Sequence, residues 1–217
     1  MSSKGSYDHI FTWAALVAAL LFVGFYFARE QVGQSERVKS EFPVISDIGE
    51  FTFTNQHGQL FGSTQMKGKF WVADVFFSRC PTLCLTMTRN MGRLRDALKD
   101  EPLLGFVSLS SDPDFDTPEV LNVYAKRMAS MADSEPEWHF LTGKKEEVYK
   151  TVLEGFRLAA TEKKAEERES PTDLVIHSSI FVIVDPSGKV RSSLDGGDDF
   201  LLEVAIEKIK SVINTVQ

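Results

Sequence analysis

The stretch FWVADVFFSRCPTLC, residues 70–84, decides the fold of this chain. Its first eight residues are apolar except for one aspartate and rich in aromatic side chains, which is typical of a strand buried on both faces of a sheet. From Thr82 to Lys99 the apolar side chains recur at helical spacing. We therefore predict a buried strand that runs into a helix, with the two cysteines of the stretch at the junction.

The remaining sequence continues this alternation of strands and helices. Apolar runs predict strands at residues 51–54, 59–61, 103–110, 138–141 and 179–184, and amphipathic runs predict helices at 117–129, 144–155 and 200–216. Such an order is typical of an α/β protein with a mostly parallel sheet covered on both faces. Residues 179–191 are predicted to add an antiparallel edge. We expect a thioredoxin-like fold with an N-terminal β-hairpin and one helical insertion.

The charge of the chain excludes one class of function. The 217 residues carry a net charge of -7, and no cluster of Lys and Arg stands out. Binding to DNA or RNA relies on such basic clusters. We therefore expect no nucleic-acid partner.

An uncharged segment near the N-terminus, the nineteen residues from Ile10 to Ala28, predicts one transmembrane helix. Trp13 and Tyr26 lie near its ends, as interfacial anchors do. A cleaved signal peptide is the alternative, but the segment is longer than a usual signal region and lacks a convincing small-x-small cleavage site. The expected organisation is a flank at 1–9, an anchor at 10–28, a tether at 29–45 and a thioredoxin-like domain at 46–217.

The N-terminal flank also bears on location. Its nine residues contain no Arg and include Asp8, unlike a mitochondrial transit peptide. The segment that follows is therefore predicted to lie in a bacterial inner membrane.

The only two cysteines, Cys80 and Cys84, are separated by three residues. A disulfide across so short a loop adds little stability, so the pair is better suited to chemistry than to structure. A helix start favours anions, and we expect the Cys80 thiol to ionise more easily than an isolated thiol. If helical geometry begins by Thr82, both sulfurs face one side and can bind a metal or form a disulfide. Thiolates suit Cu(I), whereas a structural zinc ion needs four protein ligands and only two cysteines are present. The alternative is that the two cysteines are inert buried thiols.

One of the four histidines, His177, lies just before the predicted strand at 179–184. In a thioredoxin fold the loop entering this strand packs against the active-site cysteines and usually supplies a proline. Position alone is equally compatible with a metal ligand and with an ordinary core histidine. His9, His57 and His139 lie in the flank, in a predicted turn and in a short strand, and we assign them no site.

Three collinear segments resemble the Sco/SenC family, the copper chaperones that assist cytochrome c oxidase assembly. They are TNQHGQLFGSTQMKGKFWVADVFFSRCPTLC (54–84), SLSSDPDFDTPEVLNVYAKRM (108–128) and VIHSSIFVIVDPSGKV (175–190). The predicted N-terminal anchor also agrees with the family. Asp112 and Asp116 match it too, and we assign them to turn formation and helix capping.

The resemblance implies that Cys80, Cys84 and His177 bind a copper ion through two thiolates and one imidazole. It also implies an extracytoplasmic domain, here in the periplasm. That domain would deliver copper to the binuclear copper centre of oxidase subunit II or to another client, or keep the cysteines of the client reduced.

The sequence departs from the family pattern at three positions. Thr82, Leu85 and Ile176 stand where the family commonly has an acidic residue, a proline and an aspartate. We therefore expect a divergent member.

Two functions stay open at this stage. A copper-binding assembly factor is not an enzyme in the turnover sense, whereas a thiol-disulfide oxidoreductase attacks a partner with Cys80 and resolves the intermediate with Cys84. A thiol peroxidase is disfavoured because Phe77 stands where a peroxiredoxin places a threonine.

Overall fold

The computed structural model describes residues 13, 17–29, 41–128, 136–158, 160–162, 175–197 and 200–216. It divides the chain into two compact units, residues 1–41 and 42–217. The second unit contains all the described strands and both cysteines.

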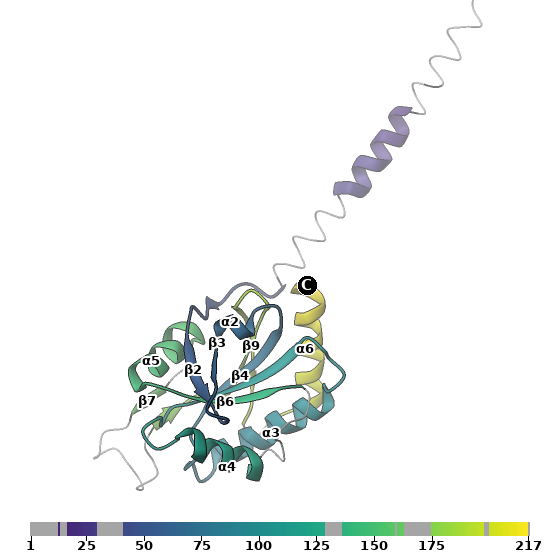
Figure 1. Cartoon of the computed structure of the whole chain (residues 1–217). Coiled ribbons are helices and arrows are strands. Elements are labelled where there is room, and N and C mark those ends of the chain that lie inside the picture. The colour runs from purple at the N-terminus through teal and green to yellow at the C-terminus, as the bar shows by residue number, and fades with distance from the viewer. Residues whose placement is uncertain are drawn as a thin grey trace, which may run out of the picture. The chain divides into compact units, whose positions relative to one another are not determined.

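An eight-stranded sheet forms the centre of the second unit (Figure 1). Its strands lie in the order β1-β10-β9-β4-β5-β6-β2-β3. Their bounds are β1 Ser46–Asp47, β2 Thr52–Asn55, β3 Leu60–Gly62, β4 Phe70–Phe76, β5 Leu104–Ser110, β6 Trp138–Thr142, β9 Ile180–Val184 and β10 Lys189–Asp195. A separate two-stranded sheet pairs β7 (Ala160–Glu162) with β8 (Val175–His177).

Helices cover both faces of the large sheet (Figure 1). One face carries α3 (Leu83–Ala97), α4 (Pro118–Met128) and α6 (Leu202–Val216). The other face carries α2 (Ser63–Met66), α5 (Lys145–Lys150) and the π-helical turn η1 (Thr151–Gly155). The predicted α/β class, its helix-covered sheet and the N-terminal hairpin β2–β3 are confirmed.

Strand β4 separates the two hydrophobic layers. Phe70, Val72 and Phe76 pack into the layer under α3, while Trp71 and Val75 pack into the layer under α5. All seven residues of β4 are buried, and the strand pairs with β5 on one side and β9 on the other. The prediction of a strand buried on both faces is therefore confirmed.

The predicted strand directions are only partly right. Among the described strands of the large sheet, β4–β5 and β5–β6 are parallel and the other five neighbouring pairs are antiparallel. The prediction of a mostly parallel sheet is therefore wrong. Helical crossovers produce parallel neighbours, as α3 and α4 do here, but β9 returns antiparallel to β4 and the hairpin β2–β3 joins antiparallel to β6. The hairpin β9–β10 thus lies inside the sheet, with β1 beyond it.

Two local differences concern the later part of the chain. The helix predicted at 144–155 ends at Gly155 as expected, but its last five residues form the π-helical turn η1. The charged segment TEKKAEERES, residues 161–170, begins inside β7, which pairs with β8. Residues 163–170 lie outside the described residues.

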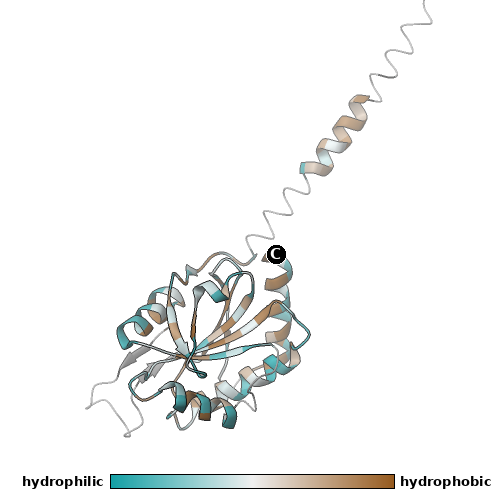
Figure 2. Ribbon diagram, viewed as in Figure 1, coloured by the Kyte–Doolittle hydropathy of each residue, from teal (hydrophilic) through white to brown (hydrophobic). Residues whose placement is uncertain are grey.

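Residues 17–29 of the first unit form a helix whose side chains are mostly apolar (Figure 2). Leu20, Leu21 and Phe22 are 71%, 69% and 70% exposed. None of the helices within the described ranges is both long and apolar enough to cross a membrane. The transmembrane segment predicted at 10–28 lies partly outside the described residues.

Candidate functional site

The two cysteines lie where strand β4 gives way to helix α3. The strand ends at Phe76 and the helix begins at Leu83, so Cys80 lies in the connecting loop and Cys84 in the first helical turn. The backbone N–H of Cys84 donates to the Cys80 sulfur, with 3.4 Å between the nitrogen and Sγ. The start of the helix thus offers this sulfur an N–H donor and the positive end of the helix dipole, both of which favour a thiolate.

The helix begins one residue later than the sequence predicts. Thr82 has backbone angles of φ −135° and ψ −82°, which are not helical. Cys80 therefore does not share a helical face with Cys84. Its sulfur instead meets the helix through the Cys84 N–H group.

Burial distinguishes the two thiols. Cys84 is completely buried, whereas Cys80 is 6% exposed. The hydrogen-bonding contact with Cys80 and burial raise the pKa of the Cys84 thiol above its ordinary value of 9.0, and the negative charge of Asp74 acts in the same direction. Removing both protons is therefore unfavourable unless a cation compensates. A soft monovalent cation such as Cu(I) fits two thiolates, and a disulfide removes both charges by another route.

The backbone of His177 ends strand β8, three residues before β9 begins at Ile180. Because β9 runs antiparallel to β4, the residues that enter β9 lie at the end of the sheet where β4 leads to the cysteines. Cys80 and His177 are therefore brought to the same end of the sheet by the topology. The side chain of His177 is outside what the structure describes, and its role as a ligand stays a prediction.

A hydrogen-bonded link ties this entrance to helix α3. Gly196 donates its N–H to the carbonyl of Ser179 at 2.7 Å. The side-chain nitrogen of Asn90 on α3 donates to the carbonyls of Gly196 and Gly197, at 3.0 and 2.9 Å. The segment that follows His177 is thus connected to the helix that carries Cys84.

Sequence reasoning missed a contact between the cysteine loop and the loop after β5. Asp116 is completely buried, and its carboxylate accepts hydrogen bonds from the backbone N–H and the hydroxyl of Ser78. The helix-capping role expected of this region belongs to Thr117, whose Oγ1 accepts from the N–H of Val120 at 3.4 Å. Ser78, two residues before Cys80, was the one sequence feature that could have indicated this contact. Its partner Asp116 is 38 residues away, so no local pattern connects the two.

The structure describes two of the other histidines. The ring of His139 stacks on Phe61 with 3.9 Å between centroids, and its Nε2 lies 2.8 Å from a carboxylate oxygen of Glu137. His57 is exposed in the turn between β2 and β3. His9 lies outside the described residues.

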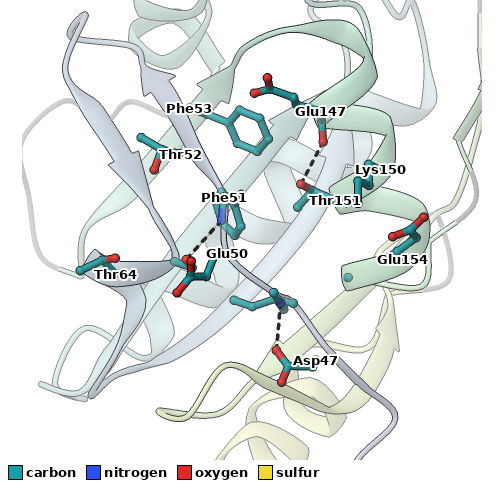
Figure 3. Close-up of a pocket in the computed structure, with 14 residues that line it drawn as sticks. Asp47, Glu50, Phe51, Thr52, Phe53, Thr64, Glu147, Lys150, Thr151 and Glu154 are labelled. Atoms are coloured by element: carbon teal, nitrogen blue, oxygen red, sulfur yellow. Dashed lines mark hydrogen bonds between the residues drawn. The ribbon is translucent and has the colours of Figure 1, made fainter.

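A pocket of about 590 Å³ opens on the opposite face of the sheet (Figure 3). It is lined by the loop between β1 and β2, by α2 and by α5 with η1, and it contains neither cysteine nor histidine. Its carboxylates come from Asp47, Glu50, Glu147 and Glu154. Among the side chains that the structure describes, no three from His, Cys, Asp and Glu gather closely enough to hold a metal ion.

Comparison with known proteins identifies relatives of the whole second unit. The family model SCO1/SenC matches residues 44–214. A crystal structure of a SCO1/SenC family lipoprotein from Bacillus anthracis is 35% identical, covers 77% of this chain and 95% of its own, and has a TM-score of 0.67. BsSco, a member of the Sco family of cytochrome c oxidase assembly proteins with a disulfide switch, is 33% identical (76% and 92% covered, TM-score 0.62).

One structure of a less similar relative contains copper. Yeast Sco1 with copper bound is 25% identical to this chain, over 78% of this chain and 89% of the yeast chain, with a TM-score of 0.62. The family match covers more than half of the chain and extends over the cysteine loop, α3 and the strands that follow His177. The chain belongs to the SCO1/SenC family.

Proposed function

We propose that this protein is a copper-binding chaperone that acts in assembly of the copper centre of cytochrome c oxidase. Cys80, Cys84 and His177 hold the copper ion through two thiolates and one imidazole. The observation that carries the proposal is the pair of buried thiols at the start of α3, where the Cys84 N–H group donates to the Cys80 sulfur. The client is oxidase subunit II or another extracytoplasmic copper protein.

Three kinds of support converge on this proposal. Thiolates are soft ligands suited to Cu(I). Copper is bound by yeast Sco1, and BsSco is a member of a family of oxidase assembly proteins. The backbone of His177 lies at the end of the sheet that carries the cysteines.

The surroundings of the thiols are less acidic than the family pattern. Thr82 is exposed and Leu85 is half-buried, and neither carries the charge or the ring that the family commonly places there. These two replacements leave the proposed sulfur and nitrogen ligand atoms unchanged. We therefore propose the same copper ligands as in the family pattern. The client is either subunit II or a related protein.

An anaerobic titration with Cu(I) tests the ligand set. The protein is residues 42–217, a compact unit with its own core, as wild type and as His177→Ala. We expect one copper per wild-type domain and a clear loss of affinity in the variant. Equal stoichiometry and affinity in the two proteins would remove His177 from the ligand set.

The second candidate is a membrane-anchored thiol-disulfide oxidoreductase, favoured by the contact between the Cys84 N–H group and the Cys80 sulfur, which brings the two cysteines together. The Cys80 thiolate attacks a disulfide of the partner, forming a mixed disulfide and releasing one partner thiolate. Cys84 then attacks the Cys80 sulfur, so that the Cys80–Cys84 disulfide forms and the second partner thiolate leaves. The partner gains two electrons and this protein loses two. The Cys84→Ser variant tests this reaction, because it should trap a mixed disulfide between Cys80 and the partner. If no mixed disulfide forms with subunit II or with another client that has cysteines in its copper site, this function is excluded.

We also propose that the N-terminal segment anchors the protein to a bacterial inner membrane, with the second unit in the periplasm. The exposed apolar side chains of the helix at 17–29 support an apolar environment for this segment. The Bacillus anthracis relative is a lipoprotein, a different way of attachment to a membrane. Fractionation of cells that express the full chain or residues 42–217 tests the anchor. Recovery of the full chain in the soluble fraction would contradict it.

A further inference from the structure

The loop after β5 lies along the loop that carries Cys80. The N–H and the hydroxyl of Ser111 both donate to the carbonyl of Phe76, the last residue of β4, at 2.8 and 3.1 Å. Arg79 donates to a carboxylate oxygen of Asp112 through Nε and a terminal nitrogen, at 3.0 and 2.6 Å. The guanidinium carbon of Arg79 also lies 4.1 Å from the centroid of the Phe115 ring. These contacts follow the cysteine loop from its start toward Cys80.

The centre of this contact is the carboxylate of Asp116. Its Oδ2 accepts from the backbone N–H of Ser78 at 3.1 Å and from the hydroxyl of Ser110, and its Oδ1 accepts from the hydroxyl of Ser78. Asp116 has no exposed surface. A buried carboxylate is costly unless hydrogen bonds satisfy it, and three donors do so here.

Two of these three hydrogen bonds fix the backbone and the side chain of one residue, Ser78. The chain then turns within two residues, with the Cys80 N–H donating to the carbonyl of Phe77 at 3.2 Å. The position of Ser78 therefore sets the direction from which the Cys80 sulfur approaches the Cys84 N–H. Asp116 accepts these hydrogen bonds from Ser78 and Ser110, so it acts on Cys80 through Ser78.

We propose that Asp116 is a positioning residue for Cys80. By holding Ser78 at two points, it keeps the Cys80 sulfur at the start of α3, where both copper binding and disulfide formation need it. This inference rests on the proposed function where it is tested by Cu(I) affinity. Where it is tested by the potential of the Cys80–Cys84 couple, it depends only on the two thiols.

A second buried aspartate supplies a matched control. Asp185 is 2% exposed and also accepts from a serine hydroxyl and from backbone N–H groups, through Ser187 and Lys189. Its other carboxylate oxygen accepts from Nε of Arg191 at 2.6 Å. It follows β9, whose last residue Val184 pairs with Trp71 near the start of β4. Asp185 therefore performs the same kind of hydrogen bonding at the opposite end of β4 from the cysteines.

The experiment compares Asp116→Asn, Ser78→Ala and Asp185→Asn with the wild-type full chain. Three quantities are measured: the Cu(I) affinity by competition with a chelator, the midpoint potential of the Cys80–Cys84 couple in a thiol buffer, and the melting temperature. We expect Asp116→Asn to weaken Cu(I) binding by up to about 10-fold, the lower end of the loss seen when a direct hydrogen-bond partner of a metal ligand is removed, because Asp116 acts on Cys80 only through Ser78, and to shift the potential. Ser78→Ala should change both quantities in the same direction but less, because the backbone N–H bond remains. Asp185→Asn should lower only the melting temperature.

The result that overturns the inference is Asp116→Asn behaving like Asp185→Asn, with a lower melting temperature but unchanged affinity and potential. If Asp116→Asn does not fold, Ser78→Ala decides by the same two readouts. Failure of the wild-type chain to bind Cu(I) would contradict the proposed function, and the potentials of the variants would still decide whether Asp116 positions Cys80.

Discussion

The two faces of the central sheet differ in what they offer a ligand. The face under α3 carries two thiols with almost no exposed area, joined by the contact between the Cys84 N–H and the Cys80 sulfur. The opposite face carries an open pocket of about 590 Å³, lined by carboxylates from separate elements. The first face thus brings two sulfur atoms together, whereas the second face has the open pocket. Convergence of donor atoms, rather than the size of a hollow, is therefore our reason for proposing the cysteines as the site.

Replacing a thiol gives the largest effect that this comparison predicts. Cys80→Ser and Cys84→Ser should each abolish tight Cu(I) binding, because a hydroxyl is a poor ligand for a soft cation. Glu50→Gln and Glu154→Gln, in the pocket, should leave Cu(I) binding unchanged. Chelator competition under anaerobic conditions measures all four proteins. If a pocket variant lost Cu(I) binding and a cysteine variant kept it, the copper site would lie in the pocket and not at the cysteines.

Replacing His177 should give the next largest effect. His177→Ala removes one proposed ligand and keeps both thiolates, so the affinity should fall while binding remains measurable. His139→Ala is the control, because its ring packs against Phe61 and bonds to Glu137 away from the thiols. The absorption spectrum of the Cu(II) form should change with His177→Ala alone. Identical spectra for wild type and His177→Ala would count against an imidazole ligand.

Alkaline pH should destabilise the face that carries the thiols. The pKa of Cys84 is raised in the folded protein, so the unfolded chain releases this proton near pH 9.0 while the folded chain retains it. Stability is therefore fully present below pH 9 and falls above it, by up to about 1.4 kcal/mol per pH unit for one such group. Urea unfolding of the reduced, copper-free protein measures this slope. Cys84→Ser should flatten it, and an equal slope in that variant would assign the effect elsewhere.

Acid should affect the pocket face, and only weakly. The hydrogen bond from Lys189 lowers the pKa of Asp47 below its ordinary value of 3.8, with help from the Gly49 N–H. This contribution to stability is present above pH 3.8 and is lost as the pH falls below it. Because Asp47 is exposed, the effect should stay under about 1 kcal/mol. Asp47→Asn compared with wild type in acid unfolding measures it, and a larger loss would show that the pair is better shielded than its exposure indicates.

The strand and helix around the cysteines were predictable because local patterns determine them. Residues 70–77 are apolar and buried on both faces, and α3 differs from its predicted bounds by one or two residues at each end. The alternation of strands and helices likewise predicted the α/β class. The antiparallel pairing of β9 with β10 was predicted from the turn between them and is confirmed. The antiparallel pairing of β9 with β4 was not predicted, because it depends on how a long connection returns to β4 rather than on a local pattern.

The contacts that hold the site together were harder to predict than the cysteines themselves. Spacing alone singled out Cys80 and Cys84. The hydrogen bonds from Ser78 to Asp116 join residues 38 apart, and aspartates near a helix start have a simpler local explanation as caps. The short strand β8 gave no clear pattern, because three residues are too few to show alternation.

The burial of β4 has a consequence for how the protein opens. Backbone amides exchange with solvent in an order set by local stability, and a central strand paired on both sides is among the last segments to open. The two-stranded sheet β7–β8, with three residues in each strand, has far fewer bonds to break. Fluctuations that release the segment of His177 therefore leave the loop of Cys80 attached to the slowest-opening part of the molecule. We therefore expect the thiols to keep their spacing while the segment of the proposed third ligand opens and closes.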